Sequence, residues 1–372
     1  SFVDDPTRIF RAIRFEQRYN WSIGRETIQW IKSAIKMGIL ERLSGARIFH
    51  ELDKMWNDKE PVKCMERLLH LRVFSGFSKH MQNTIELQFL EKIKANLEFY
   101  DRLKEHDKRL KAVDRWKCYL SGCTRIFSTK QLDELLAFLN VHGSHAKSVH
   151  AIKLNAHKIV KSLRSHSKKH ATSSSDAFAT PPHSEVYQRW KGLPVELWSE
   201  KQLRKYWNEN FKGQHLTQTD FCKKYRINQG NFSSWLNEKK NSSASSNAVR
   251  VWILELLQKT VTTPSSDAIA TPPHSEVYQL LKGVSVEAIL LAMCQIEHKF
   301  HAVLIRYLTS MQFERVLVNG NDLKVKLSLK PGPHFAHILK DLLAHQLDGL
   351  VPHDNVQQQL DHVRNVLVPK YQ

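Results

Sequence analysis

Cysteine pairs and metal-binding motifs are missing from this sequence. Its 372 residues include only five cysteines, an odd number with no CxxC spacing: Cys64, Cys118, Cys123, Cys222 and Cys294. This excludes a disulfide framework and a cysteine-based zinc site, and it is typical of a reducing compartment. No HExxH or Cys/His spacing occurs among the 20 histidines either, so we expect no metal site in this chain.

Long apolar runs are also missing. No run approaches the roughly 18 residues that cross a bilayer, and no secretion leader precedes the first helical pattern. We therefore expect an intracellular protein, in the cytoplasm or an organelle matrix, with no membrane contact. A composition of 41% hydrophobic and 25% charged residues excludes a wholly disordered or collagen-like chain.

Acidic residues are scarce relative to basic ones. The chain has 56 Lys and Arg against 37 Asp and Glu, which gives a net charge of +19. Lysine and arginine displace counterions from phosphates, so a nucleic acid is the expected partner. An inert basic surface is the alternative. The length fits two or three domains.

Strand-like alternation of apolar and polar residues is scarce, and helical spacing replaces it. From Pro6 to about Leu163, apolar residues recur three and four positions apart, as in Ile9, Ala12 and Ile13. The sequence therefore predicts an all-α fold.

A basic stretch ends this helical region, because no acidic residue occurs between Ile152 and His170. The run is either a solvated helix face or a phosphate-contacting stripe. Its candidate RNA contacts are Lys153, Lys158, Lys161, Arg164, Lys168 and Lys169.

Two Ser/Thr/Pro-rich segments open an internal repeat. Residues 174–188 recur as 265–279 with one change, Phe178 to Ile269. A repeat that occurs only twice is no solenoid, and it indicates a duplication around an inserted module. We place a linker with the first copy at 171–197, the insert at 198–259 and a second linker at 260–273.

The insert contains a pattern typical of a helix-turn-helix. Residues 216–236 read as two short helices around a turn, in which Thr217 and Asn228 are candidate caps. The second helix of such a motif enters the major groove, where Asn and Gln suit adenine edges. The candidate DNA contacts are Gln229, Asn231, Ser233 and Ser234, with Lys239 and Lys240 on phosphates. A structural module without DNA binding is the alternative.

The first residues carry the most information. In Asp4-Asp5-Pro6-Thr7-Arg8, a proline stands at the first helical position behind an aspartate N-cap. Asp5 is in one interpretation only a cap. In the other interpretation, the carboxylates of Asp4 and Asp5 meet the Arg8 guanidinium at one edge of the helix. The carboxylate acceptors and the guanidinium donors would together hydrogen-bond a planar base.

This stretch closely resembles the neck of the bacterial-type tRNA nucleotidyltransferase and poly(A) polymerase family, the enzymes that add CCA, or part of it, to tRNA 3′ ends. Residues 43–52, with Arg47 and Glu51, look like the next neck motif. Residues 275–278, 319–323, 331–333 and 347–349 look like the body and tail in family order. The resemblance covers about 1–163 and 274 to the end.

The resemblance implies roles and domains. Asp5 and Arg8 would form the template that reads CTP or ATP, next to Asp4 and Arg11, while Arg47 and Glu51 would brace the template helix. Lys330 and His334 in the tail join the candidate RNA contacts. The fold would be an elongated array with a neck at 1–60, a body at 61–170, and the body end and tRNA-binding tail at 274–372, carrying the helix-turn-helix-like insert.

The family's catalytic head has no counterpart in these residues. No Asp-x-Asp occurs in the chain, and the aspartates that hold two Mg²⁺ would precede Ser1. We expect Mg²⁺ only with that head, CTP and ATP as substrates, and no nucleotide addition by this chain alone. The expected partner is tRNA, and a separate head is a candidate partner. A non-enzymatic DNA-binding regulator acting through the insert is the alternative, and a passenger insert is a third interpretation.

Overall fold

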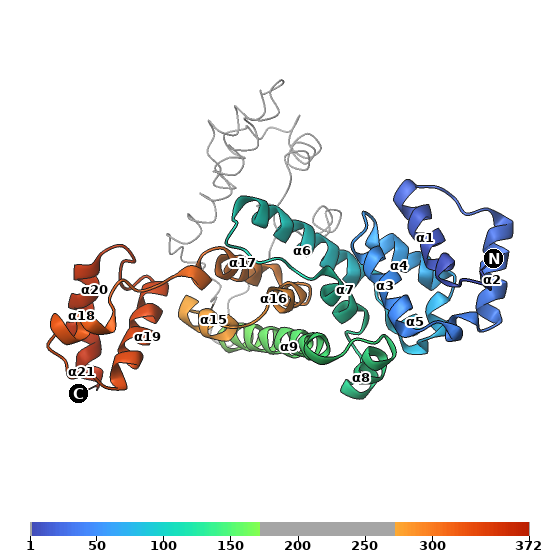
Figure 1. Cartoon of the computed structure of the whole chain (residues 1–372). Coiled ribbons are helices and arrows are strands. Elements are labelled where there is room, and N and C mark those ends of the chain that lie inside the picture. The colour runs from blue at the N-terminus through green and yellow to red at the C-terminus, as the bar shows by residue number, and fades with distance from the viewer. Residues whose placement is uncertain (1, 172–271, 372) are drawn as a thin grey trace, which may run out of the picture. The chain divides into compact units, whose positions relative to one another are not determined.

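The computed structural model describes residues 2–171 and 272–371 (Figure 1). The chain divides into two compact units, one formed by Ser1–Ser173 with Thr271–Gln372 and the other by Ser174–Ala270. The predicted linkers, the first repeat copy and the helix-turn-helix with Gln229, Asn231, Ser233 and Ser234 lie outside the described residues.

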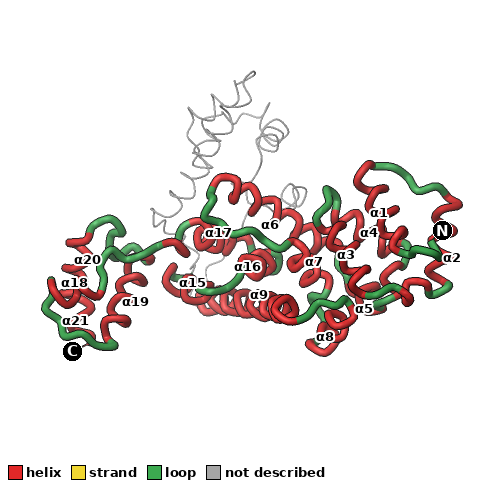
Figure 2. Tube along the Cα trace, viewed as in Figure 1, coloured by secondary structure: helices red, strands yellow, loops and turns green. Residues whose placement is uncertain are grey.

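Helices make up all the regular structure of the described residues, and no strand occurs among them (Figure 2). The all-α prediction is therefore confirmed. No helix in residues 2–171 and 272–371 is long and apolar enough to cross a membrane. The four cysteines that the structure describes are buried free thiols, and burial raises the pKa of Cys64 to about 12.

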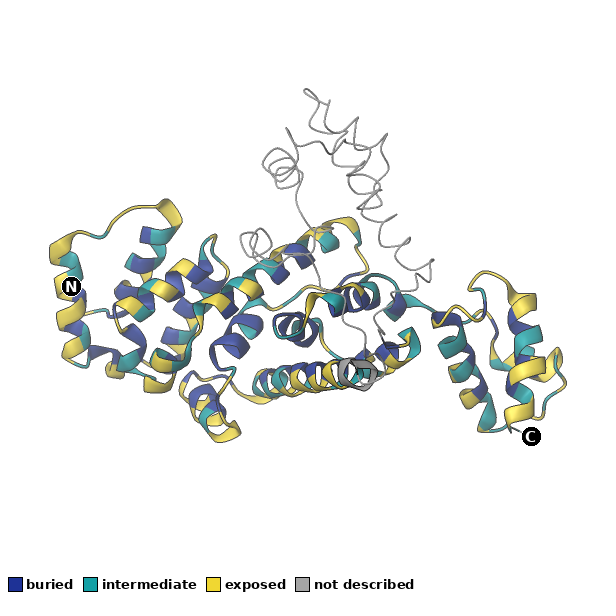
Figure 3. Cartoon of the chain, turned by 180° about the vertical axis from the view of Figure 1, so that it is seen from behind, coloured by how far each residue is buried: buried dark blue, intermediate teal, exposed yellow. Residues whose placement is uncertain are grey.

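The N-terminal helices pack around α1 (Thr7–Tyr19). It contacts α3 (Gly45–Trp56) and α4 (Pro61–His70), while α2 (Arg25–Lys36) packs on η1 (Ile39–Arg42). The apolar face of α1, with Ile9, Phe10 and Ile13, is fully buried, as helical spacing predicts (Figure 3). The opposite face carries arginines.

A second group of helices follows. It contains η2 (Val73–Gly76), α5 (Lys79–Thr84), α6 (Leu87–His106), α7 (Arg115–Cys123), α8 (Thr129–Phe138) and the long α9 (Gly143–Ala171). Helix α7 contacts α3, α6 and α9, so it connects the N-terminal helices to the long one. Capping fixes some of these starts: Ser128 and Gln131 form a capping box at α8.

The chain after residue 271 completes the same core. Helices α15 (His274–Leu281), α16 (Val286–Met293) and α17 (His301–Thr309) follow, with η4 (His298–Phe300) and η5 (Met311–Phe313). Helix α16, buried from Ala288 to Met293, packs on α9, α7 and α6. The Asn96 side chain, from α6, donates to the Leu290 carbonyl at 3.1 Å. Segments on both sides of the insert thus share one core.

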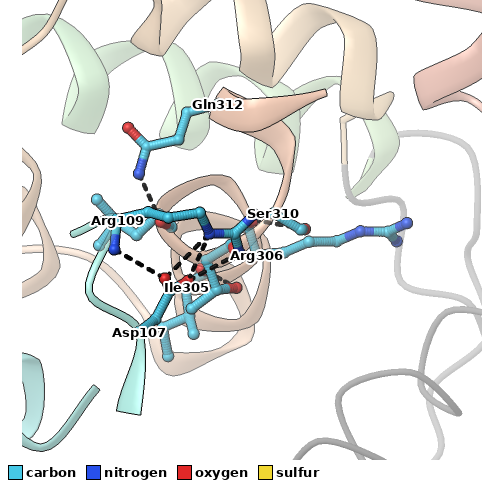
Figure 4. A network of polar contacts seen from close by, with 8 residues as sticks. Asp107, Arg109, Ile305, Arg306, Ser310 and Gln312 are labelled. Atoms are coloured by element: carbon cyan, nitrogen blue, oxygen red, sulfur yellow. Dashed lines mark hydrogen bonds and ion pairs between the residues drawn. The ribbon is translucent and has the colours of Figure 1, made fainter. Parts of the chain in front are cut away.

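A polar network closes the C-terminal end of α17 (Figure 4). The Asp107 carboxylate accepts three bonds from the Arg109 guanidinium, at 3.0, 3.2 and 2.8 Å, and one from the Arg109 amide at 3.0 Å. Arg109 also donates to the Thr309 carbonyl at 3.4 Å, and Ser310 donates to the Arg306 carbonyl at 2.9 Å. The last carbonyls of a helix lack partners within it, and this network supplies donors to the carbonyls of Arg306 and Thr309.

The C-terminal helices have a core of their own. They are α18 (Gly320–Val325), α19 (His334–Leu347), α20 (Val356–His362), η6 (Val363–Leu367) and α21 (Val368–Tyr371). Leu323, Leu342 and Val363 are fully buried in it. The connection to α15 is polar, because Ser275 donates from its amide and hydroxyl to the two Asp348 oxygens, at 2.9 and 2.6 Å.

Candidate nucleic-acid interface

The first turn of α1 is organised by the Asp5 carboxylate. Its Oδ1 accepts bonds from the Thr7 hydroxyl at 2.6 Å and the Thr7 amide at 3.2 Å. Pro6 occupies the N-cap position and the helix begins at Thr7, one residue later than the sequence predicts. The Asp5 side chain nevertheless binds an amide of the first turn, as a capping residue does.

Arg47 reaches the same oxygen from α3. Its guanidinium donates to Asp5 Oδ1 at 2.9 Å. The Arg8 guanidinium lies on the other side, with Nε 3.9 Å from Asp5 Oδ2. The structure thus brings Asp5, Arg8 and Arg47 together, although they are separated by up to 42 positions in the sequence.

Hydrogen bonds and positive charges keep Asp5 ionised. The Thr7 hydroxyl bond is the main cause that lowers the pKa of this carboxyl below its ordinary value, and the Thr7 amide and the Arg47 and Arg8 charges add to it. Three donors occupy Oδ1, whereas Oδ2 has only the distant Arg8. A carboxylate oxygen has room for further donors, so the site presents an acceptor beside the donors of Arg8.

Glu51 takes a different position from Arg47. It lies one turn further along α3 and is 5% exposed. Its Oε1 accepts from Lys54 at 2.9 Å, and its Oε2 is buried with no hydrogen-bond partner among the described residues. Of the two expected bracing residues, only Arg47 makes a hydrogen bond to Asp5 at the start of α1.

The other nucleotide-binding candidates are on the surface. Asp4 precedes the helix and is exposed, and Arg11 is exposed on α1, one turn after Arg8. At 3.6 residues per turn, a spacing of three places Arg8 and Arg11 on one side of the helix.

The basic stretch of α9 divides into buried and exposed positions. Lys153 is half-buried, with its ammonium donating to the Thr124 carbonyl at 2.5 Å and to the Phe127 carbonyl at 3.3 Å. Burial lowers its pKa to about 8. Arg164 donates to the Gln295 carbonyl at 2.8 Å. Lys153 thus has a structural role at a half-buried position, whereas Arg164 is exposed and contacts one main-chain carbonyl.

The remaining basic candidates are exposed or partly exposed, or have side chains outside the described residues. Lys158 and Lys161 are exposed on α9. Lys168 and Lys169 belong to the same helix, but their side chains lie outside the described residues. Lys330 is exposed before α19, and His334 is partly exposed at its first position, with its ring centroid 5.0 Å from that of Phe335. No hydrogen bond or ion pair among the described residues joins this tail pair to Asp5.

An aromatic pair at the end of α1 was not foreseen from the sequence. The rings of Tyr19 and Trp21 stack with centroids 4.7 Å apart. Both are at least half exposed, at 50% and 67%. Residues two positions apart do not face each other on a helix, so the sequence pattern did not predict this contact. The rings stack because Asn20 between them adopts a left-handed conformation, with φ of 54°.

The described residues hold no cluster of three or more His, Cys, Asp or Glu side chains that could bind a metal ion. These residues present one ionised acceptor at Asp5, arginine donors beside it, and exposed aromatic rings at the end of α1.

Comparisons with known proteins match parts of this chain. Residues 20–85 match the family described as the probable RNA and SrmB-binding site of polymerase A. The A-adding tRNA nucleotidyltransferase of Geobacter sulfurreducens is 35% identical over 165 residues, covering 40% of this chain and 18% of that protein. A multifunctional CCA protein of Neisseria gonorrhoeae is 38% identical over 68 residues, covering 18% and 17%.

Solved structures share the fold at lower identity. The Thermotoga maritima CCA-adding enzyme complexed with tRNA matches with a TM-score of 0.55 and 19% identity, over 100% of this chain and 62% of that one. A CCA-adding enzyme with ATP matches with a TM-score of 0.54 and 20% identity, over 99% and 61%.

Residues 20–85 thus match an RNA-binding family model, and segments of the chain are similar to curated tRNA nucleotidyltransferases. The solved CCA-adding enzymes share the fold of the chain. The chain spans less than a fifth of the length of the two curated relatives.

Proposed function

We propose that this chain is the nucleotide-selecting and tRNA-binding part of a tRNA 3′-end nucleotidyltransferase. The observation that carries the proposal is the arrangement of Asp5, Arg8 and Arg47. Arg47 fixes one Asp5 oxygen at 2.9 Å, which leaves the other oxygen beside Arg8.

The donors and acceptors of this arrangement suit two of the four bases. Cytosine and adenine each place an amino donor next to a ring nitrogen acceptor, which matches Asp5 Oδ2 next to the Arg8 guanidinium. Uracil and guanine place a carbonyl where that amino group would be, and this oxygen would face the Asp5 carboxylate. Asp4 and Arg11 flank the template, and a bidentate pair discriminates between bases by about 1–3 kcal/mol.

The exposed basic residues are the proposed contacts to the tRNA backbone. RNA helices are recognised mostly by shape and phosphate, which suits lysines on helix surfaces. Lys158 and Lys161 on α9 are exposed for such contacts. Lys168, Lys169, Lys330 and His334 complete the proposed set, whereas Lys153 and Arg164 are bound to main-chain carbonyls.

Nucleotide transfer itself requires groups that stabilise the attacking 3′ oxygen and the leaving pyrophosphate. We assign this stabilisation to a nucleotidyltransferase head with its Mg²⁺ ions. CTP or ATP would bind between that head and the template. Glu51 would support Arg47 from within α3. The particular nucleotide added depends on that complete enzyme.

Competition binding tests the proposal against the DNA-binding alternative. The full chain should bind tRNA in preference to duplex DNA of equal length, and removal of residues 198–258 should leave tRNA binding intact. Lys158→Ala with Lys161→Ala should weaken tRNA binding, and Glu134→Ala serves as a control at another exposed helix position. Preference for duplex DNA that disappears with residues 198–258 would contradict the proposal.

A further inference from the structure

The end of α1 presents two stacked aromatic rings to solvent. Tyr19 and Trp21 lie 4.7 Å apart with an interplanar angle of 28°. Trp21 is 67% exposed although one of its faces rests on Tyr19, so its other face is open. We propose that this pair is a stacking platform for an unpaired base of a bound RNA, and that Arg11 and Arg18, which are exposed on α1, contact the phosphates leading to it.

The platform is held in place by buried charges. The Arg67 guanidinium donates to both Glu16 oxygens, at 2.8 and 3.0 Å, and Glu16 is 6% exposed. The same carboxylate accepts from the Ile23 amide at 3.0 Å, and the Glu16 carbonyl accepts from the Trp21 amide at 2.9 Å. Hydrogen bonds to Glu16 therefore fix the backbone of the turn at Trp21 and at Ile23. A platform that is already ordered binds without paying for loop ordering.

The charges on α1 match a phosphate backbone. Its exposed charged side chains are all arginines, Arg8, Arg11 and Arg18, and its only acidic residue is the buried Glu16. Spacings of three and seven place these arginines along one face. The row spans about 15 Å from Arg8 to Arg18, at 1.5 Å per residue.

Arg18 connects the row to the rings. Its guanidinium lies 5.7 Å from the Tyr19 ring centroid, with one nitrogen 3.8 Å from Asp58 Oδ2. A cation beside an aromatic ring favours stacking of an electron-rich base on the same surface. The Asp58 carboxylate is shared with Arg14, at 3.2 Å, so it does not neutralise the row.

Unpaired RNA is the ligand that fits these features together. Stacking on aromatic side chains tolerates any base, and sequence-tolerant stacking joined to a cationic track is typical of single-strand recognition. Bases inside a duplex already stack on one another and cannot use the platform. Trp21 lies within residues 20–85, the segment that matches the RNA-binding family. The inference rests on the proposed RNA-binding function and names the part of the RNA involved.

Fluorescence anisotropy with the full chain tests the platform. The probes are a short fluorescein-labelled oligo(A) RNA and a blunt-ended RNA duplex, each also competed with tRNA. Trp21→Leu should weaken oligo(A) binding by about tenfold or more, because stacking of one base contributes on that scale. Trp21→Phe keeps an aromatic face and should retain most of the affinity. Trp30→Leu is the matched control, because Trp30 is 61% exposed on α2.

The outcomes separate this inference from the proposed function. Equal losses for oligo(A) and duplex, or equal losses in Trp21→Leu and Trp30→Leu, would overturn the platform. Unchanged oligo(A) binding in Trp21→Leu would also overturn the platform. The two rings would then be a contact surface for a protein partner. Oligo(A) binding that depends on Trp21 in a chain with no preference for tRNA would support the platform and contradict the proposed function. Unchanged thermal unfolding of the variants confirms that each is folded.

Discussion

At the scale of single residues, carboxylates held by several donors set the geometry of their neighbours, one of them buried (Glu16) and one partly exposed (Asp5). Glu16, paired with Arg67, fixes the turn that carries Trp21. Asp5, held by Thr7 and Arg47, offers one oxygen at the start of the same helix. Removing one partner of a buried pair leaves an uncompensated charge, so such pairs impose one conformation at some risk to stability.

His301 gives the fold a dependence on pH. Burial, followed by the nearby His298, lowers the pKa of His301 from 6.5 to about 4. The unfolded chain binds the proton more readily in that window, so the free energy of unfolding should fall as the pH drops from about 6.5 towards 4. The slope for one group is at most about 1.4 kcal/mol per pH unit.

The His301→Gln variant isolates this contribution. Its amide can still donate to the Met293 carbonyl, which lies 2.9 Å from His301 Nε2, but it cannot be protonated. Urea unfolding of both proteins at several pH values between 7 and 5 should show a shallower dependence in the variant. Parallel curves would show that His301 is not protonated differently in the folded state.

At the scale of elements, close approaches decide how the helices meet. Gly45 begins α3, and a Cβ at this position would lie 1.5 Å from the Phe138 carbonyl oxygen. The end of α8 therefore touches the start of the helix that presents Arg47. This contact gives a physical reason for the glycine in Ser44-Gly45-Ala46, which the sequence alone identified only by resemblance.

Gly45→Ala should destabilise the protein by about 1–3 kcal/mol, towards the upper end, because backbone rather than a flexible side chain must move. Gly24→Ala is the matched control, since nothing lies within 4 Å of its Cβ position. Chemical denaturation measures both. A Gly45→Ala variant as stable as Gly24→Ala would mean that α3 and α8 do not approach as described.

The sequence predicted local elements better than their contacts. Proline and aspartate at residues 5–6 predicted the start of α1 to within one residue, and helical spacing predicted its buried face. The pattern could not predict that Lys153 would bind main-chain carbonyls, because its partners are up to 29 positions away. The hydrogen bond from Asn96 to the Leu290 carbonyl joins residues 194 positions apart, so the spacing of apolar residues along the chain could not predict it either.

At the scale of the whole molecule, one core is built from two stretches of sequence. Helices α9 and α16 flank residues 172–271 in the chain and pack on each other. The resemblance predicted that 274–372 would continue the same family pattern, which stays a prediction, and the solved CCA-adding enzyme shares the fold of the chain. The excess of positive charge, +19, belongs to the entire chain and favours binding to a polyanion.

The central claim is that Asp5 and Arg8 select the nucleotide. The most direct measurement joins this chain to the catalytic head of the Geobacter sulfurreducens A-adding enzyme and follows incorporation of all four nucleotides into tRNA. The joined protein should accept ATP, CTP or both, and reject UTP and GTP. Arg8→Ala should reduce that selectivity by about tenfold to a hundredfold, from a loss of about 1–3 kcal/mol, while tRNA affinity stays nearly constant. Unchanged selectivity, or equal losses of selectivity and tRNA affinity, would contradict the template role.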